Sequence, residues 1–343
     1  MVPQRVLSLI VPAYNMRECL DSCLASLKLE QEDVASAVQV IVVDDGSVDE
    51  TGEIAERWHA RYPSQVDVVH KGNGHYGSCV NVGLCLARGR YVKLLDADDT
   101  VDGEEFLRFL KYLRSCEKDL VLSDFTLVDT EGRILRHRAY DDSVAEGGLL
   151  ALLDEKNPLQ NPAITYRTEL LTGLPYQQVE RVSYSDVEWC IYPLARVRTI
   201  GCSHCRLYRY LIGRSGQSVS QYYRLRNDLE SVLKSLLENY RSYLEKAIST
   251  DNKMFMTSRV AEHARFVLEV IVSNARLTDL RREYNRVFDG LAESDEINEA
   301  VKELKILRHL GGIRLFALMR THFVSVFPLM LLYRWRLKIG GGR

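Results

Sequence analysis

The sequence predicts an α/β fold, with a mostly parallel sheet in the first domain and a mainly helical second domain. In the first half of the chain, short runs rich in β-branched residues alternate with amphipathic helical stretches, which is typical of a sheet covered on both faces. The connections are short, so successive strands should pair as neighbours. The chain has 343 residues, which is more than a single core usually covers. We therefore expect two domains, residues 1–220 and residues 221–343.

Five strands are predicted, each an apolar run that ends where polar residues begin. They cover residues 6–11, 38–43, 66–70, 90–95 and 119–128. Between them, apolar residues recur every three or four positions, which predicts helices around residues 16–27, 54–58, 78–88 and 106–113. From about residue 221 to residue 310, apolar residues again repeat at helical spacing among charged ones, and this pattern indicates a small helical bundle.

The composition excludes several classes of protein. With 46% hydrophobic and 27% charged residues, the chain is an ordinary globular protein and is neither disordered nor fibrous. Its eight cysteines lack the pattern of a secreted disulfide framework, and the N-terminus lacks the apolar core of a signal peptide. We therefore expect a cytoplasmic location. The net charge is −2, and we expect no nucleic-acid partner.

The C-terminal segment is both basic and apolar. From Leu304 onward there are eight Lys or Arg residues and no Asp or Glu. Two apolar stretches within residues 313–338 are too short to span a membrane, and Pro328 interrupts the longer one. Two interpretations stay open. Either this segment makes a peripheral contact with the anionic inner face of the cell membrane, or it closes the helical core or a homodimer interface.

Residues 72–77, Gly-Asn-Gly-His-Tyr-Gly, spell the G-x-G-x-x-G pattern between a predicted strand and a predicted helix. This pattern binds a dinucleotide pyrophosphate at a helix N-terminus, and an acidic residue about 20 positions further on binds the ribose. Asp96 stands close to that position. One hypothesis is therefore an NAD-dependent dehydrogenase. The motif, however, follows the third predicted strand and not the first.

Polar residues follow the predicted strands at their carboxyl ends, where open α/β folds bind ligands. In chain order these residues are Pro12-Ala13-Tyr14-Asn15, Asp44-Asp45-Gly46-Ser47, His70-Lys71-Gly72-Asn73 and Asp96-Ala97-Asp98-Asp99. Carboxylates at two strand ends should repel one another unless a cation joins them. An Asp-x-Asp beside a second acidic pair suits Mg²⁺ or Mn²⁺ bound to a diphosphate. A dehydrogenase would have no use for this cluster.

The chain resembles the family 2 glycosyltransferases in motifs that occur in the family's order and spacing. They are Ile10-Val-Pro-Ala-Tyr-Asn15, Val43-Asp-Asp-Gly-Ser47, Lys71-x-Asn73, Asn81-x-Gly83 with Ala87-x-Gly89, and Leu95-Asp-Ala-Asp-Asp99. The resemblance covers about residues 5–215. It implies the Rossmann-like GT-A fold of nucleotide-diphospho-sugar transferases. It also implies inverting transfer of a sugar, with a UDP-sugar as the expected donor, to a hydroxyl of a glycan or lipid-linked acceptor in polysaccharide or cell-envelope synthesis.

The resemblance also implies roles for individual residues on the donor side. The residues that would bind the nucleotide-sugar are Pro12, Tyr14, Asn15, Asp44, Asp45, Lys71, Asn73 and Asp96. Within this set, Pro12 and Tyr14 would flank the base, Asp45 would bond its edge, and Asp96 would lie near the ribose. Lys71 carries a second interpretation, as a solvated charge at a strand end.

The metal is assigned to the end of the acidic motif. The resemblance implies that Asp98 holds Mn²⁺ or Mg²⁺ on the diphosphate. Asp99 has two interpretations: it either supports the metal site or caps the following helix.

Inverting transfer needs a carboxylate that takes the proton of the acceptor hydroxyl. The segment Val182-Ser-Tyr-Ser-Asp186-Val-Glu188-Trp189 resembles the family's loop-to-helix segment that carries this base, and Asp186 matches its position. Ser185 replaces the usual Glu before it, which leaves a supporting carboxylate in doubt. Glu188 is the reserve candidate, and a helix cap is the alternative for Asp186. Trp189 would either form an acceptor wall or pack in the core, which is the favoured interpretation.

Arg214 and Ser218 lie in a segment that resembles the part of related transferases that closes over the donor phosphates. Guanidinium and hydroxyl groups suit phosphate oxygens, so both are candidate diphosphate contacts. A surface turn between two domains is the alternative. Three functional hypotheses stay open: the inverting transferase, which we favour, the dehydrogenase, and a non-catalytic nucleotide-binding module on the same fold.

Overall fold

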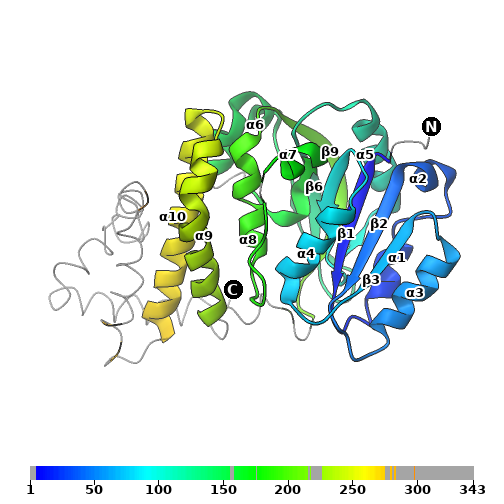
Figure 1. Cartoon of the computed structure of the whole chain (residues 1–343). Helices are drawn as coiled ribbons and strands as arrows, with labels where there is room; N and C mark the ends of the chain where they lie inside the picture. The colour runs from blue at the N-terminus through cyan, green and yellow to red at the C-terminus, as the bar shows by residue number, and fades with distance from the viewer. Residues whose placement is uncertain are drawn as a thin grey trace. The chain divides into compact units, whose positions relative to one another are not determined.

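The computed structural model describes residues 5–154, 158–174, 176–214, 217, 226–274, 279, 282 and 297 (Figure 1). The chain forms two compact units. The first is Met1–Ser220 with Ala247–Asn252, and the second is Gln221–Lys246 with Lys253–Arg343. The predicted basic segment at 313–338 and the predicted site residue Ser218 lie outside the described residues.

The first unit is built on one sheet with the strand order β3-β2-β1-β4-β8-β6-β9-β5, and β7 pairs with β6. Four strands are mutually parallel: β1 (Leu7–Ala13), β2 (Val38–Asp44), β3 (Val66–His70) and β4 (Tyr91–Leu94). Both β1 and β2 are buried over their full length, as expected for strands covered on both faces. These strands confirm the predicted parallel α/β sheet.

The other half of the sheet is mixed. β8 (Ile164–Arg167) runs antiparallel to both β4 and β6 (Leu120–Val128), and β9 (Ile200–Leu211) runs parallel to β6. The short β5 (Thr100–Val101) and the edge strand β7 (Ile134–Arg138) are antiparallel to their neighbours. Among the strands of this half, only β6 was predicted.

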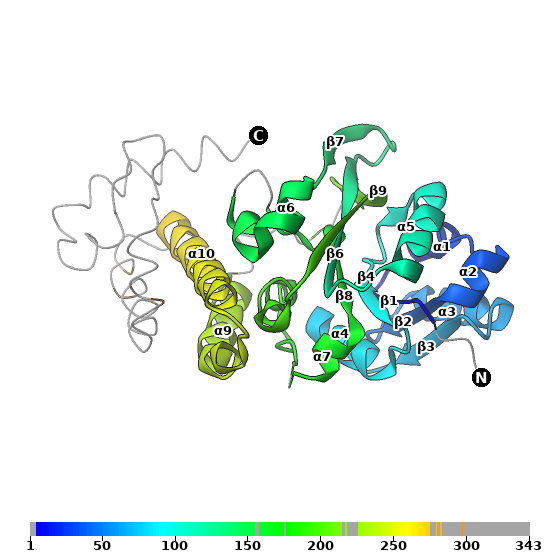
Figure 2. The same cartoon turned by 90° about the horizontal axis from the view of Figure 1, so that it is seen from above.

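Helices cover both faces of the parallel half (Figure 2). α1 (Leu20–Ala25), α2 (Glu32–Ala37) and α3 (Thr51–Arg61) lie in the β1–β2 and β2–β3 connections, and α4 (His75–Leu86) lies in the β3–β4 connection. The strand order reverses direction after β3, so right-handed crossovers place α4 on the opposite face from α1–α3. The carboxyl ends of β1–β4 therefore form an open edge at a topological switch point.

Several element boundaries differ from the predictions. α4 begins at His75, three residues before the predicted start. α5 (Gly103–Ser115) is capped by Asp102, whose carboxylate accepts a hydrogen bond from the Glu105 N–H at 3.2 Å. The cap interpretation of Asp99 is therefore wrong.

The other elements of the first unit are short. They are α6 (Asp142–Gly147), the 3₁₀ turns Gly148–Leu153 and Asn161–Ala163, α7 (Thr168–Thr172), α8 (Asp186–Trp189) and the 3₁₀ turn Tyr192–Arg196. α8 ends at Trp189, four residues before Pro193, which has no N–H to continue a helical ladder.

The second unit contains two long helices, α9 (Arg226–Lys246) and the part of α10 (Thr250–Asn274) that follows Asn252. Buried residues repeat at helical spacing on both helices, among them Leu229, Val232, Leu236, Val260 and Ala264. The Tyr240 hydroxyl and the Thr257 Oγ1 are hydrogen-bonded at 2.5 Å. Within the described part of the chain, no helix combines the length and the apolarity that a membrane crossing requires.

Candidate active site

The predicted site residues meet where β1–β4 end. The register pairs Ala13 with Asp44 and Asp44 with His70, so the loops that follow β1, β2 and β3 leave the sheet side by side. The Leu95 N–H bonds to the Ile10 carbonyl, which carries Asp96 and Asp98 to the same edge from β4. This edge is the carboxyl edge of the sheet.

The loops after β1 and β2 hold each other. The Asn15 N–H donates to Ser47 Oγ at 3.0 Å, and the Val48 N–H donates to Asn15 Oδ1 at 3.0 Å. Asn15 has a φ of 53°, a left-handed conformation that Asn tolerates better than most residues. Tyr14 stays 45% exposed between them, whereas Pro12 is buried within β1. Tyr14 is thus the exposed aromatic ring of this pair of loops.

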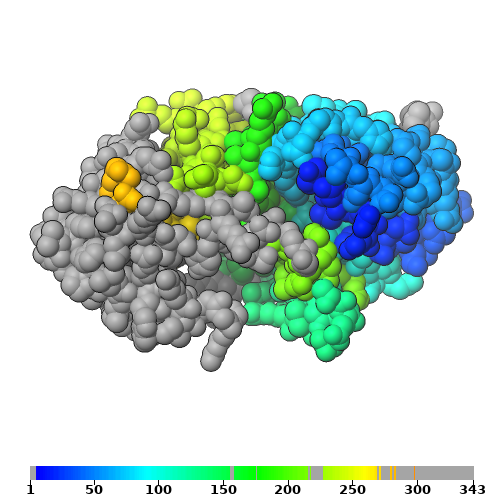
Figure 3. Space-filling view, turned by 90° about the horizontal axis from the view of Figure 1, so that it is seen from below, coloured from blue at the N-terminus to red at the C-terminus, as the bar shows by residue number. Residues whose placement is uncertain are grey.

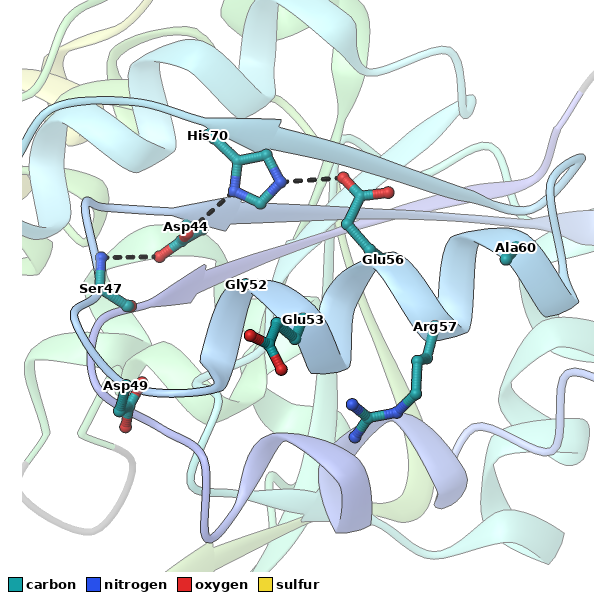
Figure 4. A pocket seen from close by; sticks show the side chains of 9 residues that line it. All are labelled: Asp44, Ser47, Asp49, Gly52, Glu53, Glu56, Arg57, Ala60 and His70. Carbon is teal, nitrogen blue, oxygen red and sulfur yellow. Dashed lines mark hydrogen bonds and ion pairs between the residues drawn. The ribbon is translucent and has the colours of Figure 1, made fainter.

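Asp44 organises the turn after β2. Its carboxylate accepts hydrogen bonds from the Ser47 N–H at 3.0 Å and from His70 Nδ1 at 2.9 Å, and His70 Nε2 lies 2.8 Å from Glu56 Oε1 (Figure 4). Burial opposes ionisation of Asp44, but the bonds from Ser47 and His70 outweigh it and lower the pKa. The bonds to Asp44 and Glu56 raise the pKa of His70. Asp44 therefore supports the turn from inside the fold.

A hollow of about 630 Å³ lies beside this cluster, between β3 and α3. Its lining residues are Asp44, Ser47, Asp49, Gly52, Glu53, Glu56, Arg57, Ala60 and His70 (Figure 4). Of the predicted site residues, only Asp44 belongs to it. The carboxylates of Asp96, Asp98 and Asp186 lie elsewhere, so this hollow is separate from the chemistry predicted at the carboxyl edge.

Lys71 holds Asp45 and the start of α4 in place. Its ammonium donates to Asp45 Oδ1 at 2.5 Å, to the Gly72 carbonyl at 2.8 Å and to Ser78 Oγ at 2.7 Å, which uses all three of its donors. Asp45 Oδ1 also accepts from the Gly74 N–H at 2.9 Å. The interpretation of Lys71 as a solvated charge is wrong. Asn73 is exposed beside this network.

The glycines of the G-x-G-x-x-G motif pack against protein. A Cβ on Gly77 would lie 2.2 Å from the Val179 carbonyl oxygen and 2.9 Å from Ser185 Oγ, and a Cβ on Gly74 would lie 2.6 Å from Ser78 Oγ. A Cβ on Gly72 would meet nothing within 4 Å. The motif therefore lets α4 approach the segment before Asp186, which is a packing role.

Asp96 is enclosed by aromatic and amide groups. Its Oδ1 accepts from the Tyr76 hydroxyl at 2.7 Å, and its N–H donates to the Tyr208 hydroxyl at 3.0 Å. Asn161 Nδ2 donates to the same Tyr76 oxygen at 3.3 Å. Burial and the neighbouring charge of Asp98 raise the pKa of Asp96 to about 7. The carboxylate is fixed in position before any ligand binds.

Asp98 and Asp99 face residues that follow β9. Asp98 Oδ2 accepts from Arg214 Nε at 3.1 Å, from Arg214 Nη2 at 2.8 Å and from Gln217 Nε2 at 3.4 Å. Asp99 Oδ1 accepts from the Leu211 N–H at 2.6 Å, whereas Asp99 Oδ2 is buried without a hydrogen-bond partner. Burial and the nearby charges of Asp96 and Asp98 hold the pKa of Asp99 well above its usual range.

Asp186 is the first residue of α8 and lies near the hydrogen bond between Tyr76 and Asp96. Burial raises its pKa, while the N–H groups of Asp186 and Val187 bond to it and oppose that rise. Burial contributes most to the raised pKa of Tyr76 and of Asp96, and the negative charge of Asp186 adds to both shifts, so Asp186 lies near these two groups. The structure therefore brings the predicted base and the predicted ribose carboxylate together.

The neighbours of Asp186 have structural roles. Glu188 is fully buried, and its Oε2 accepts from the Val179 N–H at 2.6 Å, so it does not serve as a reserve base. Trp189 is fully buried against Tyr166, with ring centroids 4.9 Å apart, which confirms core packing and excludes an acceptor wall. Ser185 is buried and is the N-cap residue of α8, without a side-chain cap hydrogen bond, whereas Asp186 is the first residue inside the helix, so Asp186 is not its cap.

Besides the predicted Arg214, four residues that were not predicted as site residues hold Asp96 and Asp98 in place. Tyr76, Asn161, Tyr208 and Gln217 each contact Asp96, Asp98 or a group bonded to them. Lys93 is buried beneath them, with its Nζ bonded to the carbonyls of Pro162 and Ile164 at 2.6 and 3.2 Å and 5.5 Å from the ring centroid of Tyr208. Burial lowers the pKa of Lys93 to about 7. A lysine inside an otherwise apolar strand is the one sequence signal that pointed here.

The sheet, with its parallel half covered by helices on both faces and acidic residues after β2 and β4, matches the GT-A class of nucleotide-sugar transferase folds. The fold is similar to the crystal structure of residues 1–349 of Staphylococcus aureus TarS in complex with UDP-GlcNAc. The TM-score is 0.69 with 19% sequence identity, and the match covers 98% of this chain and 92% of that one. At this identity, the similarity is one of fold.

Residues 8–164 form a domain that matches the model of the Glycosyl transferase family 2. The chain is 36% identical over 121 residues to the uncharacterized glycosyltransferase EpsJ of Bacillus subtilis (strain 168), covering 35% of this chain and 33% of EpsJ. It is 26% identical over 243 residues to the poly(ribitol-phosphate) beta-N-acetylglucosaminyltransferase TarS of S. aureus (strain Mu50), covering 70% of this chain and 41% of TarS. The chain thus spans a third to two fifths of the length of these relatives.

Proposed function

We propose that this protein is a metal-dependent, inverting glycosyltransferase that moves a sugar from a UDP-sugar to a hydroxyl of a glycan or lipid-linked acceptor. The observation that carries this proposal is the position of Asp186. The preceding residue, Ser185, packs against Gly77 of α4, and the neighbouring Tyr76 hydroxyl donates to Asp96, which follows β4. A base is thereby placed against the carboxylates of the donor side. The donor class is supported by TarS, whose structure was determined with UDP-GlcNAc. Catalysis is assigned to residues 1–220.

Donor binding begins at the loops after β1, β2 and β3. Tyr14 is exposed beside Asn15 and would stack on the nucleobase. Asp45 is oriented by Lys71 and by the Gly74 N–H and would accept a hydrogen bond from the edge of the base. Because these partners fix Asp45 in advance, little side-chain freedom is lost when the nucleotide binds.

The residues after β4 fit a divalent cation. Among the described residues, no three His, Cys, Asp or Glu side chains gather to hold a metal ion by themselves. Mg²⁺, however, is usually held by one or two carboxylates and completed by phosphate oxygens and water. Asp98 would provide the protein ligand, and beside it lies the buried, unpartnered Oδ2 of Asp99, whose ionised form a cation would stabilise. The cation would neutralise charge on the leaving diphosphate.

Arg214 has a second role in this proposal. Its guanidinium holds Asp98 with two nitrogen atoms in the ligand-free protein, which compensates the carboxylate charge. We propose that Arg214 turns to the diphosphate once the donor occupies the site. Ser218 is proposed as a further phosphate contact from the predicted motif alone.

The transfer step uses Asp186 as the general base. The acceptor hydroxyl gives its proton to the Asp186 carboxylate as its oxygen bonds to the anomeric carbon, and the bond from that carbon to the diphosphate breaks on the opposite face. The leaving group is the nucleoside diphosphate, and the configuration inverts. The raised pKa of Asp186 makes it a stronger base than an exposed aspartate.

Nucleotide release from UDP-sugars in the presence of Mn²⁺ tests the proposal. We expect release by the wild-type protein, loss of release after chelation of the metal, and loss in Asp98→Asn. The matched control is Glu117→Gln, which removes an exposed carboxylate remote from the site. Binding of UDP-sugars by calorimetry without any nucleotide release would instead support a non-catalytic module.

A further inference from the structure

The hairpin of β6 and β7 is exposed to an unusual extent. Every residue from Glu131 to His137 is exposed, and β7 has no strand on its outer side (Figure 2). Ile134 and Leu135 are 56% and 55% exposed and are adjacent in the chain, whereas the other large exposed apolar residues of the described chain are scattered. Single exposed apolar residues are ordinary, but edge strands are usually protected by charge and not by aliphatic pairs.

Cationic side chains flank the aliphatic pair. Arg136 pairs across the ladder with Leu127, and Arg138 pairs with Phe125, so the two guanidinium groups share one face of the hairpin. Within the described chain, neither has a carboxylate partner, and the Arg138 Nε is buried without any hydrogen-bond partner. Arg133 differs, because its guanidinium pairs with Asp129 at 2.7 Å and Glu131 at 3.0 Å. The positive charge of β7 itself is uncompensated.

A β-bulge determines how the aliphatic pair is presented. Val128 pairs with Ile134 and Leu127 pairs with Arg136, which leaves Leu135 as an extra residue without a partner across the ladder. A bulge of this kind bends the strand and changes the direction of its side chains. It therefore allows both aliphatic side chains to lie at the exposed end of the hairpin, although they are sequence neighbours.

In Figure 3 the hairpin is the blue-green lobe that protrudes at the lower edge of the first unit. It follows the carboxyl end of β6. β4 and β6 are both antiparallel to β8, so β6 ends at the carboxyl edge where β1–β4 also end. The Ile212 N–H bonds to the Val128 carbonyl at 2.8 Å, and the Leu211 N–H bonds to Asp99 Oδ1 at 2.6 Å. Leu211 pairs with Val128 across the ladder, so the end of β6 lies one strand away from the residue that bonds Asp99.

We propose that this hairpin docks the protein on a membrane surface rich in anionic lipids. Ile134 and Leu135 would enter the acyl region, and Arg136 and Arg138 would contact the headgroup phosphates, which guanidinium groups bind well. Aliphatic side chains offer neither stacking nor hydrogen bonds to a soluble glycan, so their combination with unpaired arginines favours a bilayer interface. Docking in this way would bring the carboxyl edge of the sheet to the surface, where a lipid-linked acceptor presents its hydroxyl.

Sedimentation of the full chain with lipid vesicles tests this proposal. The vesicles contain phosphatidylcholine alone or with phosphatidylglycerol, at low salt. We expect the wild-type protein to partition onto the anionic vesicles. Each arginine near an anionic surface contributes about fivefold to the partition coefficient, so the double variant Arg136→Gln/Arg138→Gln should partition about 25-fold less. Ile134→Ser/Leu135→Ser should also partition at least about fivefold less. The control, Arg57→Gln/Met254→Ser, removes one cation and one exposed apolar residue elsewhere and should behave as wild type.

Two results would overturn the proposal. One is wild-type partitioning by both hairpin variants, which would assign any membrane binding to another part of the chain. The other is that the hairpin variants bind vesicles as the wild-type protein does but no longer bind soluble polyphosphate, which would identify an anionic polymer as the ligand of the hairpin. Nucleotide release in solution should be unaffected by the hairpin variants, so failure of the proposed transferase activity is distinguishable from failure of docking.

Discussion

Replacing Gly77 by alanine should impair the proposed base without affecting the nucleotide site. The new Cβ would lie 2.2 Å from the Val179 carbonyl oxygen. An ordinary contact between these atoms is about 3.4 Å, so the segment from Val179 to Ser185 must retreat from α4 by about 1.2 Å. Ser185 directly precedes Asp186, and the displacement is therefore transmitted to the base.

A misplacement of about 1 Å in a catalytic geometry can lower the rate about 100-fold. This corresponds to about 2.7 kcal/mol in the activation free energy. Overpacking a core position costs about 1–3 kcal/mol of stability, which a domain of typical stability tolerates. We therefore expect a folded Gly77→Ala protein that releases nucleotide about 100-fold more slowly and binds the UDP-sugar normally.

The assay pairs nucleotide release with calorimetric titration of the UDP-sugar, and thermal unfolding confirms that each variant is folded. Gly72→Ala is the matched control, because a Cβ there meets nothing within 4 Å, and it should retain wild-type rate and affinity. A folded Gly77→Ala protein with a wild-type rate would refute the reasoning. Weaker nucleotide binding by Gly72→Ala would instead indicate that the motif cradles phosphate.

Three further predictions concern single side chains. Asp186→Asn should slow nucleotide release about 10²–10⁴-fold. Because burial raises the pKa of Asp186, the wild-type rate should begin to fall at a higher pH than the pH at which an exposed aspartate protonates. If Asp186→Asn released nucleotide at the wild-type rate, Asp186 would not be the general base. In the absence of a sugar donor, Arg214→Gln should bind Mn²⁺ more tightly than the wild-type protein, because the Arg214 guanidinium no longer competes for Asp98. Equal Mn²⁺ affinities of the two proteins by calorimetry would refute this prediction. Burial lowers the pKa of His263 from 6.5 to about 4, so protonation favours the unfolded state as pH falls. From pH 7 to pH 5 the free energy of unfolding, measured with urea, should decrease by about 2 kcal/mol. His263→Gln should lack this loss, and the same dependence of unfolding free energy on pH in both proteins would contradict the prediction.

The parallel half of the sheet was predictable from the sequence. β1, β2 and β4 are mainly apolar and buried along their length because both of their faces are covered, and such runs stand out from their polar surroundings. The edge strand β3 is only partly buried, but its three valines still mark it. β9 was not predicted, because its twelve residues mix buried and exposed positions and its pairing with β6 shifts register. β5 has only two residues, which is too few for any periodic pattern.

The site residues divide in the same way. Asp98 and Asp186 were found from motifs of contiguous residues. Tyr208 and Asn161 were not found, because isolated tyrosines and asparagines occur throughout the chain and nothing nearby marks them. Their contacts span 112 residues from Asp96 to Tyr208 and 85 residues from Tyr76 to Asn161.

The sequence by itself determined that Asp44, Asp45, Asp96 and Asp98 gather at one edge, because parallel strands end together and each carboxylate directly follows a strand. Only the tertiary structure decided what each carboxylate contacts. Asp98 is held by Arg214, which lies 116 residues away in the chain. A hydrogen bond depends on where two side chains meet in space, and spacing along the chain does not encode that meeting point.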